Sequence, residues 1–197
     1  MSEIWAIILA AGESKRMKAP KMLLPYKNKT IIENVIGNVI SSGIEKVIVV
    51  LGSNKDDILK VTEQMPVTNC YNENYRQGML SSVQCGFRYL DDSCGATVVF
   101  LGDQPGTRPD VINSLTEAYR KSGKGIVLPV FNNKRGHPLL IDIKYRDEVA
   151  MLNPSETLRE LVHKFPGDVL EIEVNTESVL KDIDTEEDYL NELKQIN

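Results

Sequence analysis

Short apolar runs that alternate with segments of helical spacing constrain the fold of this chain more than any other feature. The runs are rich in Val and Ile and contain almost no polar residues: Ile4–Ala10, Val47–Leu51, Ala96–Leu101 and Ile126–Val130. Strands that are buried on both faces, as in a parallel sheet, have this composition.

The segments between the runs are predicted to be helices. Apolar residues recur every three to four positions from Ile31 to Ile40, and three further segments suit helices: 56–64, 80–90 and 109–122. Gly43 and Gly123 are placed as helix stops. This alternation predicts an α/β fold, a three-layer, doubly wound (Rossmann-like), mostly parallel sheet with right-handed crossovers.

After about Phe131 the pattern changes, but no linker, repeat or low-complexity segment divides the chain. "NKRGHPLLIDI" predicts a loop and an edge strand. Two short helices, a strand and a last helix are expected at 144–152, 156–164, 169–174 and 188–193. We therefore expect residues 1–197 to form one domain.

Composition excludes several classes of protein. The three cysteines, Cys70, Cys85 and Cys94, form no C-x-x-C pair, which argues against a disulfide framework or a zinc site. The net charge of −5 gives no general attraction to nucleic acid or to a membrane surface. The first apolar run is too short for a signal peptide and follows Glu3 instead of a basic segment. We expect a cytoplasmic protein.

The loop after the first run is basic, with Gly12 followed by Lys15, Arg16, Lys18 and Lys21. A glycine turn with cations can bind phosphate, although a charged loop is more often simply solvated. The loop is neither a G-x-G-x-x-G fingerprint nor a P-loop, which disfavours a nicotinamide enzyme and a P-loop kinase.

Carboxylates follow other strands at the same predicted sheet edge. Asp103, in "GDQP", suits a Mg²⁺ ion that bridges phosphate oxygens, or else a turn or helix cap. Asp182 and Asp184 flank Ile183, so both would point to one side, and one of them could complete a metal site. Asp184 or Thr185 could equally cap a helix.

A third segment at this edge carries hydroxyl groups. Gly78 precedes an expected helix that starts near Leu80, with Ser81 and Ser82 in its first turn. Hydroxyls and free N–H groups at a helix start can bind a base or a ribose, and helix capping is the alternative.

Together these segments resemble the MobA-like NTP transferases, in particular the molybdenum cofactor cytidylyltransferase branch. The signature L-A-A-G-x-S-x-R-M-G-x-P-K-x-L-L-P is matched by "LAAGESKRMKAPKMLLP". "GDQP", "GMLSSVQCGF", "RGHPLLI" and "DIDTEEDY" match further family motifs in the right order, over residues 4–189. The resemblance implies a fold of the nucleotide-diphospho-sugar transferase type.

The resemblance also implies roles for the residues that bind the nucleotide. Leu9, Ala10, Ala11 and Gly12 would lie at the nucleotide, with the backbone of the last three around the base and phosphates. Arg16 would hold the β- and γ-phosphates.

For the remaining site residues, the resemblance implies that Lys21 holds the α-phosphate and that Ser82 faces the base or ribose. Asp103 and Asp184 would hold Mg²⁺. His137 and Arg159 would lie toward the acceptor.

The implied activity is transfer of CMP from CTP to the terminal phosphate of molybdopterin, with release of pyrophosphate. Three features depart from the family: Lys18 replaces a glycine, Tyr75 stands where a tryptophan is common, and "NPSETLREL" stands where the branch has G-D-x-G-A-R. One alternative is therefore nucleotidyl transfer from CTP or GTP to another phosphate acceptor, such as a sugar or alcohol phosphate. Another is a non-catalytic role in cofactor binding or insertion into a molybdoenzyme.

Overall fold

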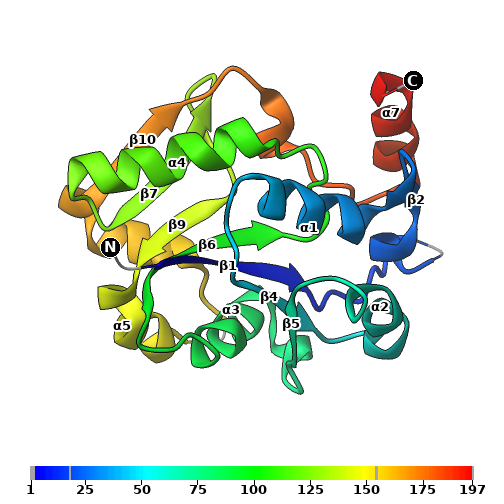
Figure 1. Ribbon diagram of the computed structural model, residues 1–197, viewed down its shortest axis with the longest axis horizontal. Coiled ribbons are helices and arrows are strands. Elements are labelled where there is room, and N and C mark those ends of the chain that lie inside the picture. Colours follow the sequence, from blue (N-terminus) through cyan, green and yellow to red (C-terminus); the bar gives the residue numbers. More distant parts are fainter. Residues whose placement is uncertain (1–2, 18, 154, 197) are drawn as a thin grey trace.

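A central sheet lies between two layers of helices in the computed structural model, which describes residues 3–17, 19–153 and 155–196 (Figure 1). The order of strands in the sheet is β10-β7-β9-β6-β1-β4-β5, and β8 pairs with β7. The strands are β1 (Glu3–Ala10), β4 (Val47–Leu51), β5 (Thr68–Tyr71), β6 (Cys94–Leu101), β7 (Ile126–Phe131), β8 (Lys134–Arg135), β9 (Leu139–Asp142) and β10 (Val169–Glu173).

The sheet is mostly parallel, because β9 and the short β8 alone run antiparallel to their neighbours within the described sheet. The chain first extends the sheet from β1 to β4 and β5, and then returns to place β6 on the other side of β1. The order therefore reverses between β1 and β6, and this is the switch point at which doubly wound folds bind ligands.

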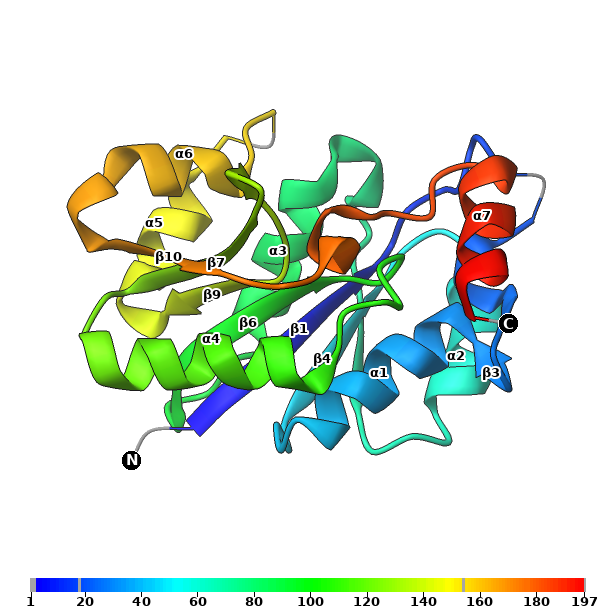
Figure 2. The ribbon, with the colours of Figure 1, turned by 90° about the horizontal axis from the view of Figure 1, so that it is seen from above.

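Helices cover both faces of the sheet, as Figure 2 shows from a second direction. They are α1 (Ile31–Ser41), α2 (Lys55–Thr62), α3 (Met79–Arg88), α4 (Pro109–Ser122), α5 (Arg146–Met151), α6 (Leu158–Lys164) and α7 (Glu186–Ile196). Apolar side chains of α3, α5 and α6 pack on the face that holds Ile7, and those of α1, α2 and α4 pack on the face that holds Ile8.

This two-sided burial explains the composition of β1. Successive side chains of a strand point to opposite faces, so a strand between two helical layers must be apolar at every position. From Trp5 to Ala10 every residue of β1 is buried. The predicted three-layer fold is confirmed.

A small hairpin, β2 (Pro25–Tyr26) and β3 (Lys29–Thr30), lies outside the sheet and contacts α7. Tyr26, Ile31 and Ile183 form a separate apolar cluster with Tyr189, and the hydroxyl of Tyr189 donates to the carbonyl of Pro25 over 2.6 Å. The C-terminal helix is thereby fixed beside the loop that follows β1.

Helix ends follow the expected chemistry. Thr30 and Glu33 form a reciprocal capping box at the start of α1. Gly43 and Gly123 adopt φ values of +88° and +69°, which confirms both as helix stops.

The prediction of an edge strand in "NKRGHPLLIDI" is wrong. β9 lies between β6 and β7 inside the sheet, and Leu139, Leu140 and Ile141 are buried. β9 is a short antiparallel strand inserted between β6 and β7, and polar residues flank it where it ends. Polar residues also flank edge strands, so the sequence pattern alone does not distinguish the two. The sequence prediction also missed β5, a true edge strand in which only Cys70 is buried.

Two helical glycines provide a stability test. A Cβ on Gly86 in α3 would lie 2.6 Å from Cγ2 of Ile7 in β1, whereas a Cβ on Gly37 in α1 would meet nothing within 4 Å. Gly86→Ala is expected to destabilise the fold by about 1–3 kcal/mol through overpacking. Gly37→Ala should stabilise it by up to about 1 kcal/mol through helix propensity.

Urea denaturation of both variants checks this pair. A Gly86→Ala variant at least as stable as the unsubstituted protein would show that α3 does not pack on β1 this closely.

The remaining global features are simple. The three cysteines are free and buried, in agreement with the sequence.

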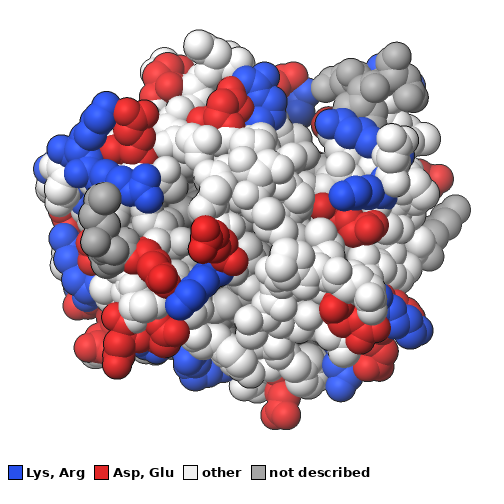
Figure 3. Space-filling model, viewed as in Figure 1, with Lys and Arg blue, Asp and Glu red and all other residues white. Residues whose placement is uncertain are grey.

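No helix within the described ranges has the length and apolar character that crossing a bilayer requires. On the face drawn in Figure 3, charges of both signs lie mainly around the margin, and the described residues form no continuous basic surface there.

Candidate functional site

The site is built where β1 and β6 end side by side. Leu9 pairs with Leu101, and the N–H of Gly102 donates to the carbonyl of Leu9 over 3.0 Å. A Cβ on Gly102 would lie 2.8 Å from that carbonyl oxygen, so the glycine permits the close approach. The loop after β1 and the "GDQP" turn therefore meet at the switch point of the sheet.

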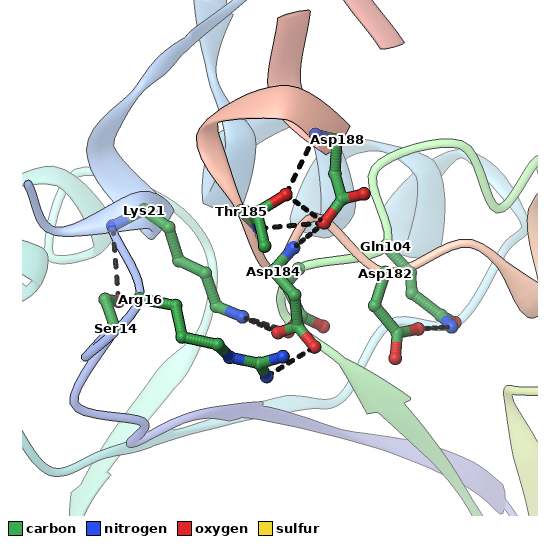
Figure 4. Close-up of polar contacts among 9 residues, drawn as sticks. Ser14, Arg16, Lys21, Gln104, Asp182, Asp184, Thr185 and Asp188 are labelled. Carbon is green, nitrogen blue, oxygen red and sulfur yellow. Dashed lines mark hydrogen bonds and ion pairs between the residues drawn. The ribbon is translucent and has the colours of Figure 1, made fainter. Parts of the chain in front are cut away.

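Lys21 connects these two segments to the C-terminal one. Its Nζ lies 2.5 Å from Oδ2 of Asp103 and 2.9 Å from Oδ1 of Asp184. Arg16 reaches the same Asp184 with an N···O distance of 2.6 Å. Figure 4 shows Lys21 and Arg16 both pointing toward Asp184 from the loop after β1. Residues that are 82 and 163 positions apart in sequence thus meet in one cluster.

The cluster is held by backbone contacts. The N–H of Ile183 donates to the carbonyl of Asp103 over 3.0 Å, which joins the C-terminal segment to the turn after β6. The N–H of Lys21, at the start of a short 3₁₀ turn, donates to Oγ of Ser14 over 3.3 Å.

The start of α7 settles one alternative. Thr185 Oγ1 accepts from the N–H of Asp188 over 3.1 Å, and Asp188 Oδ2 accepts from the N–H of Thr185 over 2.8 Å. Because Thr185 is the cap, the carboxylate of Asp184 is left to pair with the two cations. Asp182 instead accepts a hydrogen bond from the side chain of Gln104.

Burial sets the electrostatics of the cluster. The side chains of Lys21 and Asp103 are 9% and 16% exposed. Burial raises the pKa of Asp103, and the Lys21 ammonium offsets this only in part. Burial lowers the pKa of Lys21, but the two carboxylates outweigh it and the net shift is upward. Burial opposes ionisation of Asp184 too, yet Lys21 and Arg16 bring its pKa below the ordinary value.

This arrangement is suited to exchange of partners. Charges in a partly buried cluster interact strongly, and breaking a pair without replacing it is costly. A polyanion could replace the carboxylates at Lys21 and Arg16 only if a cation replaced the ammonium at Asp103 and Asp184.

The carboxylate pair fits a hard divalent cation. Mg²⁺ and Mn²⁺ prefer oxygen ligands, and Mg²⁺ is commonly bound through one or two carboxylates together with water and substrate phosphates. Among the described residues, no group of three or more His, Cys, Asp or Glu side chains forms a ready-made metal cage. Asp103 and Asp184, which share the ammonium of Lys21, provide the two carboxylates through which Mg²⁺ could bind together with water and phosphate.

The basic loop divides into two parts. Lys15 is exposed and pairs with Glu13 over 2.8 Å, as a solvated loop residue does. Arg16 and Lys21 enter the charged cluster. Lys18, the fourth cation of the sequence prediction, lies outside the described residues.

The backbone before this loop is largely buried. Leu9, Ala10 and Ala11 are buried, and the carbonyl of Ala11 accepts from the N–H of Ser53 over 3.1 Å. Gly12 is exposed, and a Cβ there would meet nothing within 4 Å. The described protein atoms therefore do not require a glycine at this position, and the space beside it is open to a ligand.

Ser82 lies in the first turn of α3, where it is buried together with Ser81. Both hydroxyls are bonded to Asn72, a buried polar residue just beyond β5 that the sequence prediction missed. A single asparagine after an unrecognised edge strand gives no distinctive sequence signal. A buried polar side chain needs hydrogen-bond partners, and Asn72 finds two of them in Ser81 and Ser82.

His137 and Arg159 are not in contact with the charged cluster. The Nδ1 atom of His137 is buried and has no hydrogen-bond partner among the described residues. Burial lowers the pKa of His137, the charge of Asp103 opposes this, and the charge of Arg159 adds to it, so the imidazole is neutral at pH 7. Arg159 is exposed on α6, within the "NPSETLREL" segment, of which Pro154 lies outside the described residues.

Comparisons with known proteins show which proteins this chain resembles. The family model of the MobA-like NTP transferase domain matches residues 6–169. The chain is 30% identical to the molybdenum cofactor cytidylyltransferase of Escherichia coli, over 96% of this chain and 95% of that protein. It is 29% identical to the nicotine blue oxidoreductase of Paenarthrobacter nicotinovorans, over 93% of each chain.

A solved structure, that of Rv0371c from Mycobacterium tuberculosis H37Rv, has the same fold. Its TM-score is 0.86 with 24% identity, and 98% of each chain is covered. The same protein has also been solved as a complex with manganese, which superposes on this chain with a TM-score of 0.80 and 23% identity.

Proposed function

Since the chain belongs to the MobA-like NTP transferase family, whose members include nucleotidyltransferases, we propose that it transfers CMP from CTP to the terminal phosphate of molybdenum-loaded molybdopterin and releases pyrophosphate. One observation carries this proposal. Two cations and two carboxylates from three distant segments meet at the switch point of the sheet, where a triphosphate and a divalent cation would exchange for the internal ion pairs.

Charge repulsion is the main obstacle to this reaction. The acceptor phosphate already is an anionic nucleophile, so attack on the α-phosphorus requires no strong general base. Lys21 would hold the α-phosphate and Arg16 the β- and γ-phosphates, and both would stabilise the charge that gathers on the departing pyrophosphate. Burial holds the stem of Lys21 beside the site, so that its ammonium can exchange the two carboxylates for a phosphate oxygen when the triphosphate and the cation bind.

Asp103 and Asp184 would hold the divalent cation, with Mg²⁺ as the expected metal. A divalent cation held there would act as a Lewis acid and neutralise phosphate charge. The manganese complex of Rv0371c supports a divalent cation in this fold. The backbone from Leu9 to Gly12 and the hydroxyl of Ser82 would contact the base, ribose and phosphates.

The proposed acceptor is molybdopterin, which the cytidylyltransferase relative supports. His137, with its unpartnered Nδ1, and Arg159 would lie on this side, and a neutral imidazole could bond to the acceptor. Because "NPSETLREL" departs from the family pattern at this place, a sugar or alcohol phosphate is the second candidate acceptor. The clustered cations and acids disfavour a purely accessory role beside a molybdoenzyme.

We further propose that residues 1–197 act as one nucleotidyltransferase domain in the cytoplasm, without nucleic acid or membrane as partner. Apart from the β2–β3 hairpin, the described strands from Glu3 to Glu173 join one sheet, which supports a single domain. The net charge of −5 favours neither nucleic acid nor an anionic membrane.

Pyrophosphate release tests the activity. The purified protein is incubated with Mg²⁺ and each of the four nucleoside triphosphates, with and without molybdenum-loaded molybdopterin. We expect release only with CTP and the acceptor together. Release that requires a sugar or alcohol phosphate would replace the acceptor, and triphosphate binding without release under any condition would exclude catalysis.

A further inference from the structure

Asn72 has one amide orientation that the backbone dictates. It follows β5, where its N–H donates to the carbonyl of Leu51 over 2.9 Å, and only 1% of the residue is exposed. Its Oδ1 accepts from the N–H of Asn74 over 3.0 Å. A backbone N–H can only donate, so the atom facing it must be the oxygen and the other end of the amide must be the NH₂ group.

That NH₂ group donates both of its hydrogens to the start of α3. Its nitrogen lies 2.9 Å from Oγ of Ser81 and 3.0 Å from Oγ of Ser82. Both hydroxyl oxygens are therefore acceptors toward Asn72, and each serine keeps one hydrogen to donate elsewhere.

The two serines use that hydrogen differently. Ser81 lies 2.9 Å from the carbonyl oxygen of Asn74 and 2.8 Å from that of Gly78, so its hydrogen is committed to the backbone. For Ser82, the part of the chain that the structure describes offers no acceptor. Asn72 therefore holds the Ser82 hydroxyl in place at the start of α3, and the hydrogen of that hydroxyl can be donated to a ligand.

This donor lies at the edge of the sheet that carries the proposed nucleotide site. Gly52, directly after β4, is packed so closely that a Cβ on it would lie 2.7 Å from Cβ of Ala11 and 2.8 Å from Cβ of Tyr75. The N–H of Tyr75 bonds in turn to the carbonyl of Asn72 over 3.3 Å. The loop after β1 is thus packed, through Gly52 and Tyr75, against the segment that contains Asn72.

We propose that Asn72 is a positioning residue that fixes the Ser82 hydroxyl as a hydrogen-bond donor to an acceptor atom of the nucleobase. The inference rests on the proposed function, because it needs the nucleotide to bind at this edge. The Watson–Crick edge of cytosine has acceptors at O2 and N3, whereas guanine has its amino group and N1–H at the corresponding positions and keeps O6 as its one acceptor there, so we place the Ser82 donor at O2 or N3. A fixed donor therefore favours CTP over GTP, since a mismatch leaves buried polar groups unpaired.

Asn72→Asp inverts this polarity with almost no change in shape. The carboxylate still accepts from the N–H of Asn74, but both serines must now donate to it, and Ser82 presents a lone pair to the base. Calorimetry of CTP and GTP binding to the full chain, with Mg²⁺, measures the result. The preference for CTP is expected to fall by about 10-fold, the effect of one lost hydrogen bond. Any repulsion between the new carboxylate and the phosphates is the same for CTP and for GTP, so it cancels in the ratio of their two dissociation constants.

Further variants separate positioning from structural support. Ser82→Ala should reduce the CTP preference to a similar extent, and the double variant should reduce it no further, because both act through one hydroxyl. Asn69→Asp, the same substitution within β5 itself, is the matched control. Asn69 accepts a hydrogen bond from the hydroxyl of Thr62 over 2.8 Å, and a carboxylate can accept it too. The preference of this variant for CTP over GTP should therefore stay unchanged.

The outcomes are distinct. Equal weakening of CTP and GTP by Asn72→Asp, with the preference unchanged, would overturn the inference and leave Asn72 a structural residue. In that case, pyrophosphate release by the unsubstituted protein would show that the proposed function survives. An unsubstituted protein that binds CTP no better than GTP would overturn both the inference and the choice of CTP.

Discussion

Alanine in place of Lys21 is expected to lower the turnover of nucleotidyl transfer by at least about 100-fold, the scale of losing one transition-state donor. The side chain is 9% exposed, and its ammonium lies between Asp103 and Asp184 at the switch point of the sheet. Once a cation takes its place at the two carboxylates, this ammonium can stabilise the charge on the α-phosphate in the transition state. Single-turnover measurement of pyrophosphate release gives the effect on the chemical step.

The control for Lys21 lies in the same loop. Lys15 is 77% exposed and pairs only with Glu13 among the described residues, so Lys15→Ala should change turnover by less than about 2-fold, as surface ion pairs contribute little. Thermal denaturation of both variants checks the fold. A Lys21→Ala variant that folds and keeps a near-normal rate would remove this residue from the catalytic account.

Replacing Asp103 with asparagine is expected to have an effect of similar size, at least about 100-fold on turnover, because the amide oxygen is a much weaker ligand for a divalent cation than a carboxylate. The amide keeps the shape of the side chain and can still accept a hydrogen bond from Lys21, so the variant should fold, with a lower thermal midpoint because the Lys21 ammonium loses one of its two carboxylates. Titration of Mn²⁺ in the presence of CTP measures the affinity for the metal separately from the rate.

Asp110→Asn serves as the comparison for Asp103. Asp110 lies in the first turn of α4, is exposed and pairs with the exposed Arg108, so its loss should leave both metal affinity and turnover unchanged. If Asp103→Asn also kept the metal affinity and the rate, Asp103 could not be a metal ligand.

The sequence predicted the central layers and the charged cluster for a physical reason. β1 contains no polar residue from Ile4 to Ala10, which only a strand covered on both faces requires. Parallel strands have their carboxyl ends at the same edge of the sheet. Lys21 lies in the loop after β1 and Asp103 directly follows β6, so the two side chains are expected to meet at that edge. The contact between these two side chains confirms that expectation.

The parts that could not be predicted depend on tertiary context. The burial of β9 between β6 and β7 is set by the return of the chain, whereas its polar flanks resemble those of an edge strand. The role of Asn72 as a bridge to two serines depends on how β5 packs beside α3, and no local pattern encodes this. The ion pair of Arg16 with Asp184 likewise joins two loops whose approach only the fold determines.

The most direct test of the shared pocket is a crystal structure of this chain with a non-hydrolysable CTP analogue and Mn²⁺, phased for the anomalous signal of manganese. We expect a manganese peak within bonding distance of both Asp103 and Asp184, with Lys21 turned from those carboxylates to a phosphate oxygen. A nucleotide bound elsewhere, while Lys21 still bridges the two carboxylates, would contradict it.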